Sequence, residues 1–414
     1  MRVVVMGGGV VGVTAAYELQ KDGHEVVLIE RNSAVGDETS WGNAGMIAPG
    51  HSFAWSSPTA PFVLLKSLFS KNQALRFTPS ADPRLWTWSL QFLAQCTESR
   101  AARNTLRKHR LAGYSQSVLQ ETLKSESIEY DRNARGILYF YRSQASLDRG
   151  VAHMKILADD GQQMRTLSRA EVIALEPSLA SAQHKIAGGI YCPTDETGDC
   201  SKFTKALAEI CKARGAEFLT GQSVEKLETS GDRVTEIRTS SGRLKADLYV
   251  MALGNQSPLL ARTIGERLPI YPVKGYSLTL PIGGNHTPPT VGAVDEDNLI
   301  AYSRMGERLR VTATADFAGY NAQYQPSDFA VMTRKIQDIL PGGADYTRPQ
   351  YWAGLRPMTP EGTPVMGTGR LKNLFFNTGH GHVGWTMSCG AARVTRDLIA
   401  GRKPAIPLDG MTLQ

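Results

Sequence analysis

The sequence predicts an α/β protein of two domains: a doubly wound domain around a parallel sheet, and an α+β domain whose sheet is mostly antiparallel. Three observations predict this. The chain opens on a strand, a glycine turn, a helix and a second strand; its middle contains runs in which apolar and polar residues alternate; and the strand–turn–helix pattern returns near the carboxyl terminus. With 414 residues, 42% of them hydrophobic, the chain can bury the cores of both domains.

The first elements along the chain are a strand at Val3 to Met6, a turn at Gly7 to Gly12, a helix at Val13 to Lys21 and a strand at Glu25 to Glu30. The apolar, proline-containing stretch from Phe53 to Leu93, which includes Phe69 and Pro79, predicts an irregular insertion. Apolar residues at helical spacing predict a long helix over 101–124.

Later runs rich in aromatic or β-branched residues predict strands at 136–142, 274–280, 299–304 and 308–315. In the last run Leu309, Val311 and Ala313 alternate with polar residues, a period of two that suits an antiparallel sheet with one wet face. The nucleotide-fold pattern resumes with a helix at 202–213, strands at 217–219, 248–253 and 374–377, and a final helix at 385–400. We expect residues 1–50, 186–264 and 350–414 to form the first domain, and residues 51–185 and 265–349 the second.

Composition narrows the function classes. The 46 Lys and Arg residues against 39 Asp and Glu give a net charge of +7, which favours carboxylate substrates or an anionic lipid surface, and no nucleic-acid motif accompanies it. Five cysteines show no metal-ligand spacing, and their odd number argues against a disulfide framework. A strand that begins at Val3 leaves no room for a signal peptide. We expect a cytoplasmic protein without metal or nucleic acid, and peripheral contact with the inner face of the cell membrane stays open.

The glycine turn carries the strongest chemical signal. Gly7-Gly8-Gly9-Val10-Val11-Gly12 fits G-x-G-x-x-G, and an acid, Glu30, ends the next strand. Gly7 permits the tight turn, Gly9 lets backbone N–H groups approach a pyrophosphate, and Gly12 lets the helix pack closely. The Glu30 carboxylate would accept hydrogen bonds from both ribose hydroxyls and repel a 2′-phosphate. The pattern predicts a Rossmann-like fold that binds a dinucleotide other than NADP, and leaves FAD and NAD open.

Further segments decide between these cofactors by resemblance. They are Asp37 to Met46, Met251 to Gly254, Gly354 to Pro360 and Asn377 to His382, with Val224 after a strand. In this order they resemble bacterial D-amino acid dehydrogenase of the small-subunit type, in the D-amino acid oxidase and glycine oxidase superfamily, over essentially the whole chain. The resemblance implies that the first domain binds FAD and the second the substrate.

The same resemblance implies which residues hold FAD. At the C-terminal turn, unpaired N–H groups of a helix start would stabilise the electron density that builds at flavin N1 and the C2 carbonyl on reduction. The implied FAD-binding residues are Gly7, Gly9, Val10, Val11, Gly12, Glu30, Arg31, Thr39, Ser40, Asn43, Ala44, Gly45, Met46, Val224, Ala252, Gly254, Gly354, Arg356, Gly379, His380, Gly381, His382, Val383 and Gly384.

The part of the site that binds the substrate is predicted from one cationic residue. Arg356, in Gly-Leu-Arg-Pro, matches the carboxylate-binding arginine of the superfamily, and a planar guanidinium can bind both carboxylate oxygens. Tyr302 and Arg304 on one strand, and Tyr276 on another, are further candidates beside the carboxylate. Ordinary strand residues with outward side chains are the alternative for these three. No side chain stands out as a general base. Solvent or the substrate's own amine equilibrium can supply the deprotonation instead.

The resemblance implies oxidative deamination of D-amino acids to 2-oxo acids and ammonia, with hydride transfer from the substrate Cα to flavin N5 and electrons passed to a quinone or another acceptor. The part of the insertion near Trp55 to Phe69 resembles a family feature near the active-site entrance; membrane contact and a packed lid or extra core are both open interpretations of it. Three alternatives remain: a dehydrogenase of D-hydroxyproline or another cyclic imino acid, a glycine or D-amino acid oxidase that uses oxygen, and a flavin-binding subunit of an assembly without its own activity.

Overall fold

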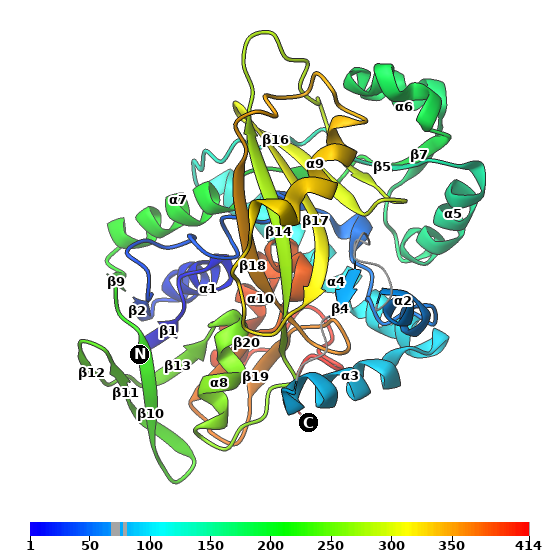
Figure 1. The fold of residues 1–414 in the computed structure, drawn as a ribbon. Helices are drawn as coiled ribbons and strands as arrows, with labels where there is room; N and C mark the ends of the chain where they lie inside the picture. Colours follow the sequence, from blue (N-terminus) through cyan, green and yellow to red (C-terminus); the bar gives the residue numbers. More distant parts are fainter. Residues whose placement is uncertain (68–74, 78–80, 414) are drawn as a thin grey trace.

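The computed structural model describes residues 1–67, 75–77 and 81–413, and two large β-sheets dominate it (Figure 1). The first sheet has six strands, in chain order β1 (Arg2–Met6), β2 (Glu25–Ile29), β9 (Glu217–Leu219), β13 (Leu248–Met251), β19 (Val365–Thr368) and β20 (Leu374–Thr378). Their spatial order is β19-β20-β13-β1-β2-β9, and all neighbours pair in parallel except β19 with β20. Five of these strands confirm the sequence prediction, and β19 was not predicted.

Both faces of the parallel sheet are covered. On one face lie α1 (Val10–Lys21), α7 (Cys200–Ala213) and α10 (Gly384–Ile399), which pack on Val3 and Val5 of β1. On the other face lie α8 (Ser257–Arg262) and a three-stranded antiparallel sheet, seen at the lower left of Figure 1, which pack on Val4 and Met6. The strands of this small sheet are β10 (Val224–Ser230), β11 (Arg233–Thr239) and β12 (Gly242–Leu244). Burial on both faces explains why β1 is continuously apolar.

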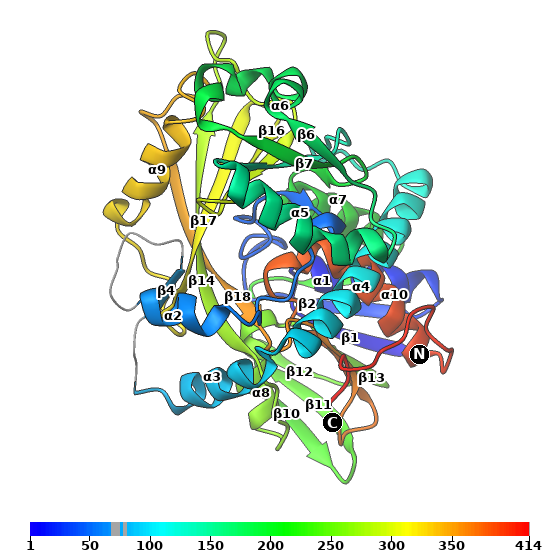
Figure 2. The same cartoon turned by 90° about the vertical axis from the view of Figure 1, so that its right-hand side faces the viewer.

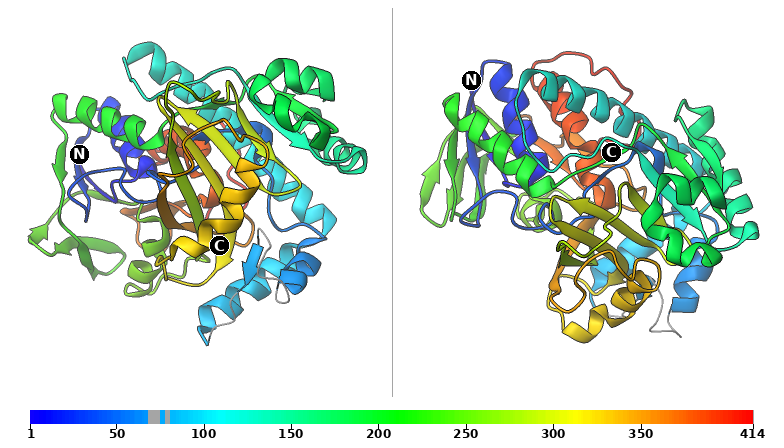
Figure 3. Two further views of the ribbon diagram at one scale, coloured as in Figure 1. Left: turned by 45° about the horizontal axis from the view of Figure 1, so that its top comes forward. Right: turned by 90° about the horizontal axis from the view of Figure 1, so that it is seen from above.

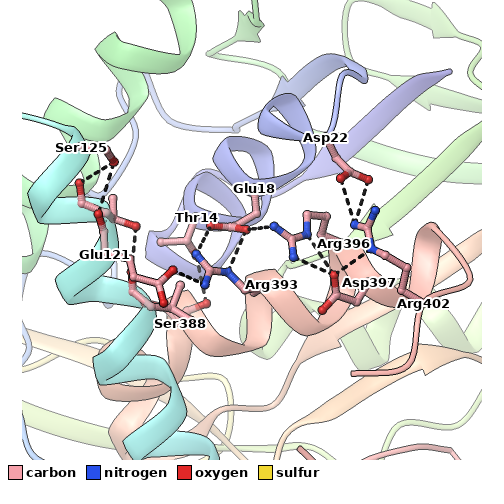
Figure 4. A network of polar contacts seen from close by, with 12 residues as sticks. Thr14, Glu18, Asp22, Glu121, Ser125, Ser388, Arg393, Arg396, Asp397 and Arg402 are labelled. Carbon is pink, nitrogen blue, oxygen red and sulfur yellow. Dashed lines mark hydrogen bonds and ion pairs between the residues drawn. The ribbon is translucent and has the colours of Figure 1, made fainter. Parts of the chain in front are cut away.

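A network of ion pairs joins the helices on the first face (Figure 4). Glu18 of α1 is 1% exposed, and its carboxylate accepts hydrogen bonds from Arg393 (3.2 Å) and Arg396 (2.8 Å) of α10. Arg393 also pairs with Glu121 of the long helix α4 (Glu98–Ser125). Since the two acids lie on α1 and α4 and both arginines on α10, the network fixes these three helices relative to one another behind the glycine turn.

The second sheet has nine strands and is mostly antiparallel. They are β4 (Leu75–Phe77), β5 (Ile137–Tyr141), β6 (Arg165–Ser168), β7 (Gly188–Cys192), β14 (Tyr271–Pro281), β15 (Gly292–Asp295), β16 (Ile300–Met305), β17 (Arg308–Phe317) and β18 (Gln350–Met358). Their order is β18-β14-β17-β16-β15-β5-β7-β6, with β4 on β17, and only the pairs β5–β15 and β4–β17 are parallel among the described strands. All four strands predicted for this region are confirmed.

Helices flank the nine-stranded sheet. One face packs on α9 (Ala330–Gln337) and the 3₁₀ turn η4 (Pro326–Phe329), while α5 (Gln144–Asp159), α6 (Arg169–Leu175) and the 3₁₀ turn η2 (Pro177–Lys185) lie near β5, β6 and β7 (Figure 2). In the right-hand view of Figure 3, the blue and red helices of the parallel sheet lie beside the olive and yellow strands of the larger sheet. A short ribbon of β3 (Met46–Ile47) and β8 (Glu196–Thr197) completes the strands.

The prediction of one wet face for β17 is wrong. Arg310, on the face expected to be wet, is 1% exposed, and its guanidinium donates to Thr279 (2.9 Å) and to the carbonyl oxygens of Trp41 (2.7 Å) and Asn43 (3.0 Å). It also lies over the Trp41 ring, 4.8 Å from the centroid. The segment around residue 42 covers this face of β17, and Arg310 donates its hydrogen bonds to that segment, which explains a polar residue at a buried position.

The prediction of an irregular insertion is wrong for most of its length. The structure places α2 (Ala60–Ser67), β4 and α3 (Pro83–Gln95) within it. Asp82 caps α3 by accepting a hydrogen bond from Arg84 N at 2.9 Å, and Pro83 occupies the first turn, which is a standard helix start. Phe69 and Pro79 lie outside the described residues. Helix α4 confirms the helix predicted next. No helix in the described part of the chain combines the length and apolar character that crossing a membrane requires.

Candidate active site

A cavity of about 1680 Å³ lies where the two sheets meet. The carboxyl ends of β1, β2, β13 and β20 form one wall, and strands β14, β16, β17 and β18 of the nine-stranded sheet form another. Ligands of open parallel sheets bind at this edge, because loops and helix starts there leave backbone groups unpaired. The cavity is large enough to hold a dinucleotide and a small substrate together.

The glycine turn opens onto this cavity as its spacing predicts. Gly7 has a φ of 107°, and a Cβ at Gly12 would lie 1.9 Å from the Gly7 carbonyl oxygen, so larger residues do not fit at either position. Glu30 lies at the cavity wall, where its carboxylate accepts hydrogen bonds from Gly8 N (2.7 Å) and Asn32 N (2.8 Å). Burial raises the Glu30 pKa and the two backbone bonds oppose it. Glu30 Oε1 also accepts a hydrogen bond from Asn32 Nδ2 (2.8 Å), so Oε2 is the oxygen that keeps a lone pair for a ribose hydroxyl.

The segment that follows β2 is held from two sides. Ser40 Oγ accepts a hydrogen bond from Val10 N at 2.9 Å, which ties the segment to the start of α1. Arg310 holds the carbonyl groups of Trp41 and Asn43 from the larger sheet. The segment therefore spans both sheets along the cavity wall.

The C-terminal turn presents polar atoms that nothing in the protein satisfies. Both amide atoms of Asn377, His380 Nε2, His382 Nδ1 and Trp385 Nε1 are buried without a hydrogen-bond partner in the described part of the chain, and all four residues line the cavity. Burial lowers the His380 pKa to about 3 and the His382 pKa well below its usual value, so both imidazoles are neutral. Unpaired polar atoms around a space of this size are the pattern that a bound polar cofactor would complete. The glycine cradle, Glu30 and this turn together fit FAD.

Most residues with an implied FAD role line the cavity. Gly12 and Gly45 lie behind its wall, where they allow close packing. The cavity-lining members are Gly7, Gly9, Val10, Val11, Glu30, Arg31, Thr39, Ser40, Asn43, Ala44, Met46, Val224, Ala252, Gly254, Gly354, Arg356, Gly379, His380, Gly381, His382, Val383 and Gly384.

Arg356 lies on β18 at the wall formed by the larger sheet. Its Nη1 donates to the Thr314 carbonyl oxygen at 3.1 Å, and no carboxylate of the described residues pairs with it. Thr314 has a φ of 65°, an unfavourable conformation for a β-branched residue of the kind that often marks functional sites. Burial lowers the Arg356 pKa to about 10, which still leaves the group cationic at neutral pH. A half-buried guanidinium that faces a cavity and has no carboxylate partner among the described residues is a site for an anion.

The structure does not bring Tyr302 and Arg304 to the cavity. Both lie on the face of β16 opposite Ala301, which lines it: Tyr302 is fully buried against α9, and Arg304 is at the surface beside Glu307. The reason is the period of two in a strand, since residues of one parity share a face. Tyr276 does line the cavity, but its hydroxyl donates to Asp316 at 3.1 Å.

Sequence reasoning missed several residues of the wall. His51, which ends the 3₁₀ turn η1 (Pro49–His51), Glu296 and Trp352 all line the cavity. Trp352 was detectable from its place two residues before Gly354. Glu296 had no signal in the sequence, because its position depends on the pairing of β15 with β5 and β16.

Comparison with known proteins agrees with this geometry. The family described as DAO, FAD dependent oxidoreductase, matches residues 2–398. The chain is 45% identical over 412 residues to D-amino acid dehydrogenase 2 of Mesorhizobium japonicum, which covers 99% of both chains. It is 43% identical over 413 residues to D-amino acid dehydrogenase of Azorhizobium caulinodans, with 100% of this chain and 99% of the relative covered.

A solved structure shares the fold. Glycine oxidase from Geobacillus kaustophilus superposes with a TM-score of 0.76 at 22% identity, over 100% of this chain and 98% of the other. The family match extends over nearly the whole chain, and the relatives exceed 40% identity over their full length. The chain therefore belongs to the DAO family of FAD dependent oxidoreductases, and FAD is its cofactor.

Proposed function

We propose that this protein is a dehydrogenase that converts D-amino acids to 2-oxo acids and ammonia. The observation that carries the proposal is Arg356, a half-buried cation that lines the same cavity as the FAD cradle and that pairs with no carboxylate of the described residues. The names of the two full-length relatives support the substrate class. FAD, when bound, supplies the redox chemistry by accepting the hydride from the substrate Cα.

The protein's own residues bind the substrate and the cofactor and orient them. Arg356 binds the substrate carboxylate, and the Thr314 carbonyl oxygen keeps the guanidinium in place. With the carboxylate fixed at one wall and the amine and side chain directed to different parts of the cavity, only one enantiomer directs its Cα hydrogen toward the cofactor, which is how the site selects the D form. The implied FAD-binding residues hold the cofactor, and Tyr276 contributes a packed wall. The neutral imidazoles of His380 and His382 add no charge beside the reacting amine.

We also propose that the electrons pass to a quinone or another component of an electron-transfer chain, at a peripheral membrane contact. Helices α2 and α3 lie near each other in Figures 1 and 2, and each exposes large apolar side chains of the kind that contact surfaces often carry. The side chains are Phe62, Leu65, Trp86, Leu90 and Leu93. The net charge of +7 would assist binding to anionic lipid.

A substrate panel tests the proposal. Holoenzyme is assayed with D-amino acids, L-amino acids, glycine and cyclic imino acids, once with an artificial electron acceptor and once with oxygen. We expect turnover of D-amino acids with the acceptor and little peroxide with oxygen. A preference for cyclic imino acids, or peroxide equal to substrate consumed, would replace the proposal by the corresponding dehydrogenase or oxidase. Bound FAD with no turnover of any substrate would indicate a subunit without its own activity.

A further inference from the structure

Part of the cavity has no role in the chemistry described so far. We call it the distal lobe and define it by His51, Phe53, Tyr141, His153 and Glu296, which all line the cavity that also contains Arg356. His51, Arg356 and His382 all line this one cavity, so the lobe is continuous with the space at Arg356. A substrate whose carboxylate lies at Arg356 therefore has this lobe available for its side chain.

A polar pair forms the centre of the lobe. His51 Nε2 lies 2.9 Å from Glu296 Oε1, although 245 positions separate the two residues along the chain. The His51 ring stacks on Tyr139 with 5.1 Å between centroids, and Phe53 packs edge-on against it. Three groups, two of them on distant segments, thus fix the imidazole, and the imidazole in turn fixes one oxygen of Glu296.

Each member of the pair keeps one polar atom without a partner. Glu296 Oε2 and His51 Nδ1 make no hydrogen bond with the described residues, and neither is among the buried unpaired atoms, so both reach open space. The Glu296 side chain is only 16% exposed, which means that a ligand hydrogen bond to it is shielded from bulk water. A carboxylate oxygen accepts hydrogen bonds and cannot donate them.

The charges around the pair favour a ligand group that donates hydrogen bonds. Asp297, next to Glu296, also lines the cavity, and its Oδ2 already accepts from Arg142 N (2.6 Å) and Ser146 Oγ (2.9 Å). Arg149 of α5 is the nearby cation at the wall, and it is exposed. Two carboxylates therefore face the imidazoles of His51 and His153 and one solvated guanidinium, while the Lys108 ammonium lies behind the wall and donates to the Phe53 carbonyl oxygen.

We propose that the His51–Glu296 pair is the subsite for the substrate side chain, and that it selects side chains ending in a hydrogen-bond donor, above all an ammonium or guanidinium. This inference rests on the proposed function, since the side chain is located by a carboxylate bound at Arg356. Glu296 accepts a hydrogen bond directly from the donor group at the end of the side chain. His51 is a positioning residue that holds Glu296 toward the cavity.

The kinetic test compares two D-amino acids with the same six-carbon skeleton. D-lysine and D-norleucine differ only in the ammonium on Cε, which norleucine replaces by a hydrogen atom. We expect kcat/KM for D-lysine to exceed that for D-norleucine by about tenfold or more, the factor that one charged hydrogen bond provides. Glu296→Gln should abolish the preference, and Glu307→Gln, a surface acid paired with Arg304 outside the cavity, should keep it.

The positioning role of His51 has its own readout. His51→Ala should reduce the D-lysine preference, whereas His51→Gln, whose amide can still donate to Glu296, should restore most of it. Equal preferences in wild type and in both variants would overturn the role of the pair. Faster turnover of D-glutamate than of D-lysine would overturn the choice of donor side chains.

A binding experiment separates this inference from the proposed function. Alkanoates of four to eight carbons without an α-amine cannot be deaminated, and we compare each with its ω-amino derivative by the change in flavin fluorescence of the holoenzyme. At one chain length the ω-amino compound should bind about tenfold more tightly, and Glu296→Gln should remove the gain. That result without turnover of any D-amino acid would overturn the proposed function and keep the subsite. Reduction of the flavin by D-alanine without any gain from the ω-amine would do the opposite.

Discussion

The guanidinium of Arg356 fits against the larger sheet because residue 275 of the neighbouring strand is glycine. Strands β14 and β18 pair with Gly275 opposite Gly354, and a Cβ at residue 275 would lie 2.5 Å from Arg356 Cζ. Because neither glycine of this pair has a side chain, the two strands leave room for the guanidinium. The proposed carboxylate site thus depends on a residue that contributes no side chain.

Gly275→Ala should displace Arg356 and weaken substrate binding. We expect the KM for D-alanine to rise by about tenfold or more, because an ion pair that loses its geometry loses most of its strength, while FAD content stays unchanged. Gly284→Ala is the matched control, since nothing lies within 4 Å of a Cβ there. Steady-state kinetics of both variants decide the matter, and an unchanged KM in Gly275→Ala would contradict the role given to Arg356.

Glu30→Ala should weaken retention of FAD. The carboxylate accepts from two backbone N–H groups and, as proposed, binds the ribose, so its removal leaves the turn and the cofactor without an acceptor. The flavin-to-protein absorbance ratio after dialysis measures the effect. Glu25→Ala, an exposed acid at the start of the same strand, should retain the cofactor. Full occupancy in Glu30→Ala would show that the ribose contact lies elsewhere.

Asp195 makes stability depend on pH. Burial raises its pKa to about 7, with opposing hydrogen bonds from Gly50 N and Tyr139. The folded state therefore binds a proton more tightly than the unfolded chain, and the contribution of Asp195 to stability is lost as pH rises from about 4 through 7. In Asp195→Asn this loss should disappear. Urea unfolding at pH 5 and 7.5 should show the difference between variant and wild type rising by about 1 kcal/mol or more with pH, and a constant difference would refute the assignment.

At the scale of elements, the helices behind the glycine turn depend on one buried acid. Glu18→Ala would leave Arg393 and Arg396 without their shared carboxylate (Figure 4). We expect a loss of about 2–3 kcal/mol in the free energy of unfolding, since both arginines lose a buried charged acceptor although Glu121 and Asp397 still pair with them. Glu121→Ala, which removes an exposed partner of Arg393, should cost about 0–1 kcal/mol. Similar losses for both variants, measured by urea unfolding, would contradict the importance of burial.

The elements were predictable where their signals are local. The strand–turn–helix at Gly7 to Gly12 and helix α4 follow from glycine positions and helical spacing, and both are confirmed. Helix α3 was missed although Asp82 and Pro83 form a recognisable start, because the prolines nearby suggested an irregular chain. The face of β16 was misjudged for Tyr302, since alternation tells which residues share a face and not which face meets the cavity.

At the scale of the whole molecule, the site is assembled from distant segments. The FAD cradle was predictable because its motifs are contiguous in sequence and lie at the ends of adjacent parallel strands. The His51–Glu296 pair was not, because only the pairing of β5 with β15 brings residue 296 toward the turn that ends at residue 51. Long-range strand pairing therefore determines the part of the cavity that binds the side chain, and the local motifs determine the part that binds the cofactor.

Anaerobic reduction of the holoenzyme tests the central claim most directly. Stoichiometric D-alanine should bleach the flavin absorbance within one turnover, L-alanine should leave it unchanged, and Arg356→Ala should slow the bleaching at low D-alanine concentration. Equal bleaching by both enantiomers, or none by D-alanine, would contradict the account of a cavity in which Arg356 binds a D-amino acid against FAD.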